Sequence, residues 1–175
     1  MTHVINLYGG PGCGKSTTAA LLYGGLKLAG ANAELVREVA KDYAWDGTHI
    51  TPLIQREITT KQAYLETRLH GKVDFIVTGA PVLLGLFYAR KYGGAELVEG
   101  IVRAHYADST AEHLHFNLCR TKPYNPKGRY QTEDEAKAFD GEIHDLVEEV
   151  LGVGKLKMCH EIDRFKPSWV MRNIL

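Results

Sequence analysis

The stretch HVINLYGGPGCGKSTTAALL, residues 3–22, decides the fold of this chain. The apolar run from His3 to Tyr8 is typical of a buried strand, and a cluster of glycines ends that run. A helical pattern begins at Ser16 and extends to Gly30, which stands where a helix C-cap is expected. A strand, a glycine-rich turn and a helix in direct succession are typical of the first unit of an α/β sheet.

The turn between this strand and helix fits the pattern G-x-x-x-x-G-K-[ST] over residues 9–16. Glycines allow backbone conformations that a β-carbon forbids, so successive N–H groups converge on phosphate oxygens at the positive end of the helix. Lys15 is placed to reach the β- and γ-phosphates, and the hydroxyl of Ser16 suits Mg²⁺. Because no NKxD-like guanine-binding motif is evident, ATP is favoured over GTP. The predicted ATP-binding residues are Gly9, Gly10, Pro11, Gly12, Cys13, Gly14, Lys15, Ser16 and Thr17.

The rest of the chain continues the alternation of strands and helices. Apolar runs predict further strands at residues 32–37, 73–78, 112–119 and 155–162. Helices are predicted over residues 16–30, 51–70, 82–92, 95–106 and 132–151, with a short one at 168–175. Thr132, followed three residues later by Glu135, forms a capping-box pattern. We expect one domain over residues 1–175, a three-layer α/β sandwich of the P-loop NTPase class with a mostly parallel five-stranded sheet.

Composition excludes several protein classes. Of the 175 residues, 45% are hydrophobic and 24% are charged, which argues against a disordered tail or a coiled-coil rod. Twenty-one basic residues balance 21 acidic ones, so we expect no binding of nucleic acid over the whole surface, although a local basic groove is compatible with this balance. No stretch approaches the ~18 apolar residues of a membrane span, and the N-terminus has no leader pattern. We therefore expect a soluble, cytoplasmic protein.

Neither the cysteines nor the histidines predict a metal centre. Cys13, Cys119 and Cys159 are far apart and lack CxxC spacing, which favours reduced thiols over a disulfide framework. The histidines show no ligand spacing with Cys, Asp or Glu, so we expect no metal cluster among them. This argument covers His3, His49, His105, His113, His115, His144 and His160. His113 and His115 alternate along a predicted strand and are expected to face one side of the sheet.

A carboxylate follows the second predicted strand. Glu38 is expected at the carboxyl edge of the sheet, beside the glycine-rich loop, which is where ligands bind in open α/β sheets. There it is positioned to accept a proton from an acceptor hydroxyl, although a solvated glutamate at a strand end is the alternative. Asp42 is a weaker candidate for the same role. Tyr43 has the chemistry to stack on a base, and packing explains it equally well.

A basic loop spans residues 120–131, between the fourth strand and the next helix. Glycine and prolines predict a shaped loop, and such a loop closing over a nucleotide would exclude water and supply cations. Arginine suits that task because its planar guanidinium binds two phosphate oxygens. Arg129 is the first candidate, Arg120 the second, and Lys127 a supporting one. The alternative is a solvated basic surface loop.

Two segments besides the glycine-rich loop carry a family resemblance. ELVREVAKD at residues 34–42 and RTKPYNPKGRYQTEDEAKAFD at residues 120–140 resemble small bacteriophage P-loop kinases related to the thymidylate-kinase group. Some members of that group are 5-hydroxymethyluridine DNA kinases. The resemblance implies that Glu38 is the acid after strand 2 and that Arg129 belongs to a lid. It also implies ATP-dependent phosphorylation of the 5-hydroxymethyl group of uracil bases in DNA, a step in phage thymidine hypermodification.

One departure from the resemblance concerns the third strand. Relatives usually carry an acid at its tip, as in T-D-[SG]-P, whereas this chain has Thr78-Gly79-Ala80-Pro81. An aspartate there would hold Mg²⁺ through water or position the acceptor, and Gly79 does neither. Either Glu38 carries more of this work, or catalysis is weaker, or the chain is altered at this site.

Two other functions are compatible with the sequence. The first is a kinase of small nucleosides or nucleotides, including a ribosylnicotinamide kinase, for which the balanced charge is favourable. The second is a nucleotide-binding regulatory module with weak ATPase activity, which the glycine at position 79 favours. The expected partners are ATP with Mg²⁺ and either DNA containing 5-hydroxymethyluracil or a small nucleoside, and nothing in the sequence indicates an oligomeric state.

Overall fold

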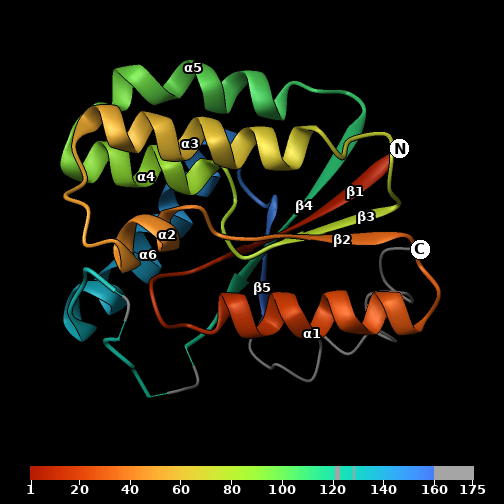
Figure 1. The fold of residues 1–175 in the computed structure, drawn as a ribbon, viewed down its shortest axis with the longest axis horizontal. Helices are drawn as coiled ribbons and strands as arrows, with labels where there is room; N and C mark the ends of the chain where they lie inside the picture. Colours follow the sequence, from red (N-terminus) through yellow and green to blue (C-terminus); the bar gives the residue numbers. More distant parts are fainter. Residues whose placement is uncertain (121–122, 128, 160–175) are drawn as a thin grey trace.

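Five parallel strands form the sheet in the order β2-β3-β1-β4-β5. The computed structural model describes residues 1–120, 123–127 and 129–159 (Figure 1). The strands are β1 (Thr2–Tyr8), β2 (Ala33–Val36), β3 (Phe75–Thr78), β4 (Ala111–Leu118) and β5 (Leu156–Cys159). The predicted five-stranded parallel sheet is confirmed, with β1, the strand that precedes the glycine-rich loop, at its centre. Residues 160–162 of the last predicted strand and the predicted helix at 168–175 lie outside the described residues.

Helices cover both faces of the sheet (Figure 1). The helices are α1 (Lys15–Leu28), α2 (Ala40–Trp45), α3 (Pro52–Thr67), α4 (Leu83–Tyr92), α5 (Ala95–Tyr106) and α6 (Glu133–Leu151). Helix α1 lies on one face, and α3, α4 and α5 lie on the other. Helix α2 was not predicted because a helix of this length is too short to show a clear apolar period.

Buried side chains lie on both faces of the sheet because side chains alternate along β1. Ile5 and Leu7 are fully buried against α1, where they meet Leu22 and Leu26. Tyr8 points to the opposite face and is buried in the cluster formed by α4, α5 and α6. Because both faces of β1 are covered, the loop that follows it leaves the sheet from a rigid position.

Capping residues set where two helices begin. Thr51 accepts a hydrogen bond from the Ile54 amide at the start of α3, and Pro52 occupies the first turn. The predicted capping box of α6 is present: Thr132 Oγ1 accepts from the Glu135 amide, and Glu135 Oε2 accepts from the Thr132 amide at 2.7 Å. Helix α6 therefore starts directly after the basic loop. Among the described residues, no helix has the length and apolarity needed to cross a bilayer.

Candidate active site

The glycine-rich loop joins β1 to α1 at the carboxyl edge of the sheet. Gly14, with φ of 107°, is the residue that precedes α1, and Gly12 has φ of 81°, so both occupy the left-handed region that favours glycine. A β-carbon at Gly12 would also lie only 2.8 Å from the ring of Tyr124. The first amides of α1 have no acceptor within the helix, and they remain available for an anion.

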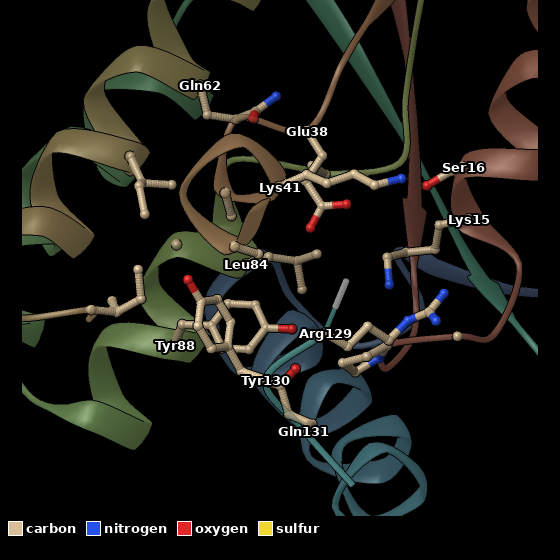
Figure 2. Close-up of a pocket in the computed structure, with 18 of the residues that line it drawn as sticks. Lys15, Ser16, Glu38, Lys41, Gln62, Leu84, Tyr88, Arg129, Tyr130 and Gln131 are labelled. Atoms are coloured by element: carbon tan, nitrogen blue, oxygen red, sulfur yellow. The ribbon is translucent and has the colours of Figure 1, made fainter. Parts of the chain in front are cut away.

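The Lys15 side chain bends back over the glycine-rich loop. Its ammonium donates hydrogen bonds to the carbonyl oxygens of Gly9 at 2.6 Å and Gly10 at 3.0 Å. Figure 2 shows the Lys15 ammonium and the Ser16 hydroxyl facing the same space. A flexible ammonium held only by carbonyls can transfer its hydrogen bonds to phosphate oxygens, which are stronger acceptors because they are charged.

A cavity of about 860 Å³ adjoins the loop. Its volume lies within the range of small-molecule sites. Six of the predicted ATP-binding residues line it: Pro11, Gly12, Gly14, Lys15, Ser16 and Thr17. Gly9, Gly10 and Cys13 are not among the lining residues, since Cys13 is buried in the core beneath α1 and the Gly10 amide donates to Asp140 Oδ1 at 2.6 Å.

Glu38 follows β2 and lines this cavity. Its carboxylate extends toward Lys15 and Ser16 from the opposite side of the space (Figure 2). Gln62, a buried residue of α3, holds the backbone on both sides of Glu38. Its Oε1 accepts from the Val39 amide at 3.0 Å, and its Nε2 donates to the Arg37 carbonyl at 3.2 Å. Gln62 was not predicted as a site residue because its partners are backbone groups distant in sequence.

The sequence analysis did not predict Lys41 and Tyr88 as residues of the cavity. Lys41 extends from α2 so that its ammonium shares the space between Glu38 and Ser16 (Figure 2). Only recognition of α2 would have placed Lys41 on the cavity side, because Glu38 itself precedes the helix. Tyr88 lines the cavity from α4. Burial, and after it the negative charge of Glu38, raises the pKa of the Tyr88 phenol well above its ordinary value, so this side chain stays protonated.

Asp42 and Tyr43, the predicted acceptor-binding residues, do not line the cavity. Asp42 Oδ2 forms an ion pair with Arg37 Nη1 at 2.5 Å. The Tyr43 hydroxyl donates to Glu57 at 2.9 Å and accepts from Lys61 at 2.8 Å. The cause is helix α2, whose rotation of about 100° per residue turns these side chains away from Lys41 and the cavity.

The basic loop places two of its predicted cations at the cavity. Lys127 and Arg129 both line it, and Arg129 extends toward Lys15 (Figure 2). The Arg129 guanidinium lies 5.4 Å from the centre of the Tyr124 ring and donates to the Asn125 carbonyl. The Tyr130 hydroxyl donates to the carbonyl of Thr48 at 2.9 Å, which joins this loop to the segment after α2. The loop thus covers one side of the cavity.

Arg120 lies behind the glycine-rich loop, and it does not line the cavity. Its guanidinium donates to the Pro11 carbonyl at 2.9 Å, to the Ala136 carbonyl at 3.0 Å and to Asp140 Oδ2 at 3.1 Å. Because Asp140 also accepts from the Gly10 amide, Arg120 and Asp140 together tie the loop to α6. In this arrangement Arg120 holds the glycine-rich loop in place and does not extend into the cavity.

A family model described as AAA domain matches residues 4–156 of the chain. The chain belongs to the AAA domain family. None of the curated proteins compared matches this AAA domain. Among solved structures, the fold is similar to that of NadR protein in complex with NR, with a TM-score of 0.72 and 17% identity over 91% of this chain and 46% of that one.

Other solved structures share the fold of this AAA domain. NadR protein in complex with NAD and AMP-PNP has a TM-score of 0.73 and 16% identity, over 98% of this chain and 49% of that one. The structure of APE1195 has a TM-score of 0.51 and 16% identity, over 99% and 97%. The chain spans about half the length of the NadR chains that it matches. At these identities the likeness establishes the fold.

The end of β3 leaves little space for the acid that is absent from this AAA domain. A β-carbon at Gly79 would lie 3.2 Å from both Cβ and the carbonyl carbon of Lys15. The Ser16 hydroxyl and the Glu38 carboxylate are oxygen donors that face the cavity beside Lys15 (Figure 2). Hard oxygen donors fit Mg²⁺, which keeps several water and phosphate ligands and needs few from the protein.

Proposed function

We propose that this AAA domain is a kinase that transfers the γ-phosphoryl group of ATP to a hydroxyl group of a small nucleoside. The observation that carries the proposal is the arrangement across one cavity. Lys15 and Ser16 face it from the glycine-rich loop, and Glu38 projects into the same space from the segment after β2 (Figure 2). A phosphate-binding loop that faces a carboxylate across one cavity suits phosphoryl transfer to an alcohol.

Glu38 is proposed to receive the proton of the acceptor hydroxyl. The acceptor oxygen forms a bond to the γ-phosphorus, the bond from that phosphorus to the β,γ-bridging oxygen breaks, and ADP leaves with the electron pair. Gln62 holds the Glu38 backbone through the Arg37 carbonyl and the Val39 amide, so the carboxylate has a defined position. General-base catalysis of this kind contributes roughly 10²–10⁴-fold to the rate.

Positive charge is available where the transferring group would lie. Lys15 and Lys41 extend into the space from opposite sides, and Arg129 extends from the basic loop (Figure 2). These cations favour the charge that develops on phosphate oxygens in the transition state. Mg²⁺, held at Ser16 when bound, supplies further neutralisation of the β- and γ-phosphates.

The walls of the cavity favour a compact acceptor with a planar ring. Tyr88 and Tyr92 line it with parallel rings, 6.3 Å between centres and 4° between planes. Leu84 and Trp45 add apolar surface to the same cavity. The hydrogen bond from Tyr130 to the Thr48 carbonyl closes one side, which suits a free nucleoside better than a base attached to a DNA strand. The similar fold of NadR protein bound to NR supports the same class of acceptor.

The DNA acceptor implied by the sequence resemblance remains a second prediction, and one experiment separates the two. Purified protein is incubated with ATP labelled at the γ-phosphate and either a panel of free nucleosides or DNA containing 5-hydroxymethyluracil. We expect label on a nucleoside, and a loss of about 10²–10⁴-fold in Glu38→Gln.

The matched control is Glu57→Gln, which removes an exposed carboxylate of α3 outside the cavity and should leave the rate unchanged. Label in the DNA alone would show that the acceptor is a base flipped out of the DNA, and not a free nucleoside. Release of inorganic phosphate without any labelled acceptor would overturn the proposal in favour of an ATPase module.

A further inference from the structure

A second group of titratable side chains lies toward the amino edge of the sheet, away from the nucleotide cavity. Glu66 is near the end of α3, His70 follows that helix, His105 is near the end of α5, and His113 is near the start of β4. One ligand atom from each of these side chains lies within 4.8 Å of the others. None of the four lines the nucleotide cavity.

These four side chains are buried and only partly paired. Glu66 is 0% exposed, and the side chains of His70, His105 and His113 are 2%, 1% and 8% exposed. Glu66 Oε1 lies 2.7 Å from His105 Nε2 and 3.9 Å from both His70 Nε2 and His113 Nδ1. Within the described part of the chain, Glu66 Oε2, His70 Nε2 and His113 Nε2 have no hydrogen-bond partner. Buried polar atoms of native proteins are nearly always paired, so these atoms indicate a missing partner.

Two of the imidazoles are oriented as metal ligands are. His70 Nδ1 hydrogen bonds with Asp108 Oδ2 at 2.7 Å, which directs Nε2 of the same ring at Glu66. His105 Nδ1 hydrogen bonds with Thr67 Oγ1 at 3.2 Å, which likewise directs its Nε2 inward. A histidine that binds a metal characteristically uses its other ring nitrogen in this way.

We propose that Glu66, His70, His105 and His113 bind a divalent transition-metal ion of the zinc class. Three imidazole nitrogens and one carboxylate oxygen form the donor set that such ions prefer. Zinc bonds of about 2.0–2.1 Å place neighbouring tetrahedral ligands about 3.3 Å apart, and the observed separations of 2.7–3.9 Å around Glu66 Oε1 bracket that value. His113 Nδ1, the atom nearest to Glu66, also hydrogen bonds with Asn6 Nδ2 at 3.3 Å, and binding of the ion through Nδ1 would replace that contact. Binding replaces the proton between Glu66 and His105, which is released to solvent.

The ion has a structural role. Four protein ligands leave no open coordination position for a substrate, which distinguishes structural sites from catalytic ones. The ligands join the ends of α3 and α5 to β4, so the ion fixes two helices of one layer to the sheet. The proposal stands independently of the proposed kinase function because it concerns different residues.

The proposed site differs from the expectation that the histidines form no metal cluster. His105 and His113 come from separate elements, so their spacing in sequence carries no ligand pattern. Glu66 and His70 lie four residues apart, on one side of a helical turn, and this pair is a local signal that the spacing argument missed. His113 and His115 do face one side of the sheet as predicted, with rings 13° from parallel.

The test is a titration of the metal-free protein with Co²⁺, followed by its displacement with Zn²⁺. We expect one equivalent of Co²⁺ with the visible absorption of tetrahedral coordination, and no near-ultraviolet band from a thiolate. We expect Zn²⁺ at about 100 times its Kd to raise the Tm by about 5–10 °C. Glu66→Gln and His113→Gln should each abolish the tetrahedral spectrum.

The matched control is His115→Gln, which removes a buried imidazole of the same strand that lies outside the cluster. This variant should still bind one equivalent of Co²⁺ and show the absorption of tetrahedral coordination. Because a cluster variant that fails to fold would be uninformative, X-ray absorption of the wild-type Zn²⁺ complex provides the second measurement, with imidazole scattering expected. No stoichiometric binding, or binding that survives both cluster variants, would overturn the proposal and leave a proton shared between Glu66 and His105.

Discussion

The two edges of the sheet carry two kinds of polar site. At the carboxyl edge, the glycine-rich loop supplies its residues from one continuous segment, beside an open cavity of about 860 Å³. At the amino edge, the neighbouring Glu66 and His70 are buried together with His105 and His113, which come from two distant segments. The first arrangement suits a ligand that enters and leaves, and the second suits one that stays. The difference teaches that a sequence motif marks the site beside the cavity, whereas the fold must bring distant residues together to complete the buried one.

The largest expected effect comes from the loop lysine. Lys15→Met removes the ammonium that faces the cavity, so we expect phosphoryl transfer to fall by about 10³-fold, the scale of losing one charge-stabilising donor. The measurement is kcat with saturating ATP and nucleoside. Lys27→Met, at the other end of α1, is the matched control and should retain full activity. An equal loss of kcat in both variants would contradict the assignment of Lys15 to the phosphate-binding site.

The buried cluster should affect stability more than chemistry. In the presence of a chelator, Glu66→Ala leaves His70 and His105 without their common carboxylate, and breaking such a buried pair costs about 3–5 kcal/mol in the free energy of unfolding. Urea unfolding measures this loss. Glu57→Ala, which removes an exposed carboxylate of the same helix, should change the free energy of unfolding far less. A small loss in the free energy of unfolding for Glu66→Ala would contradict the inference that Glu66 is a buried partner of His70 and His105.

Gln62 connects helix α3 to the active site and sharpens the comparison further. Gln62→Ala removes the hydrogen bonds to Val39 and Arg37, so Glu38 loses its defined position. Unsatisfied backbone groups here cost about 1–3 kcal/mol, and we expect kcat to fall about tenfold with little change in the KM for ATP. Thr60→Ala, at an exposed position of α3, is the control. An increase in KM for ATP alone would assign Gln62 to nucleotide binding.

The smallest expected effect concerns the side of the cavity that the basic loop covers. Tyr130→Phe removes the hydrogen bond to the Thr48 carbonyl, worth about 0.5–1.5 kcal/mol. We expect the KM for the nucleoside to rise about two- to tenfold, measured by initial rates at fixed ATP. Unchanged kinetics would show that this bond does not help to retain the acceptor.

The sequence predicted the parts that local patterns determine. The strands, the main helices and the Thr132–Glu135 capping box follow from periodicity and capping chemistry, and the structure confirms them. Helix α2 is too short for an apolar periodicity to be recognised in the sequence. Because α2 was not predicted, the sequence could not show that Lys41 turns toward the cavity while Asp42 turns away. The buried cluster escaped for another reason: only the folded chain brings His105 and His113 together.

Arg120 shows the same limit in the candidate site. Its charge and its place in a basic loop predict contact with phosphate, yet its guanidinium is bound to Asp140 and to the Pro11 carbonyl. Asp140 lies on α6, and nothing local in the sequence pairs it with the glycine-rich loop. Residue type and loop position identify a cation, and only the fold determines its partner.

The central claim is that Lys15 and Glu38 act on one phosphoryl group across a shared cavity. A crystal structure with a non-hydrolysable ATP analogue and a nucleoside tests this most directly. The account predicts that the Lys15 ammonium leaves the Gly9 and Gly10 carbonyls for the β- and γ-phosphates, and that the Glu38 carboxylate hydrogen bonds to the acceptor hydroxyl. A Lys15 still bound to its own loop, or an acceptor hydroxyl out of reach of Glu38, would contradict it.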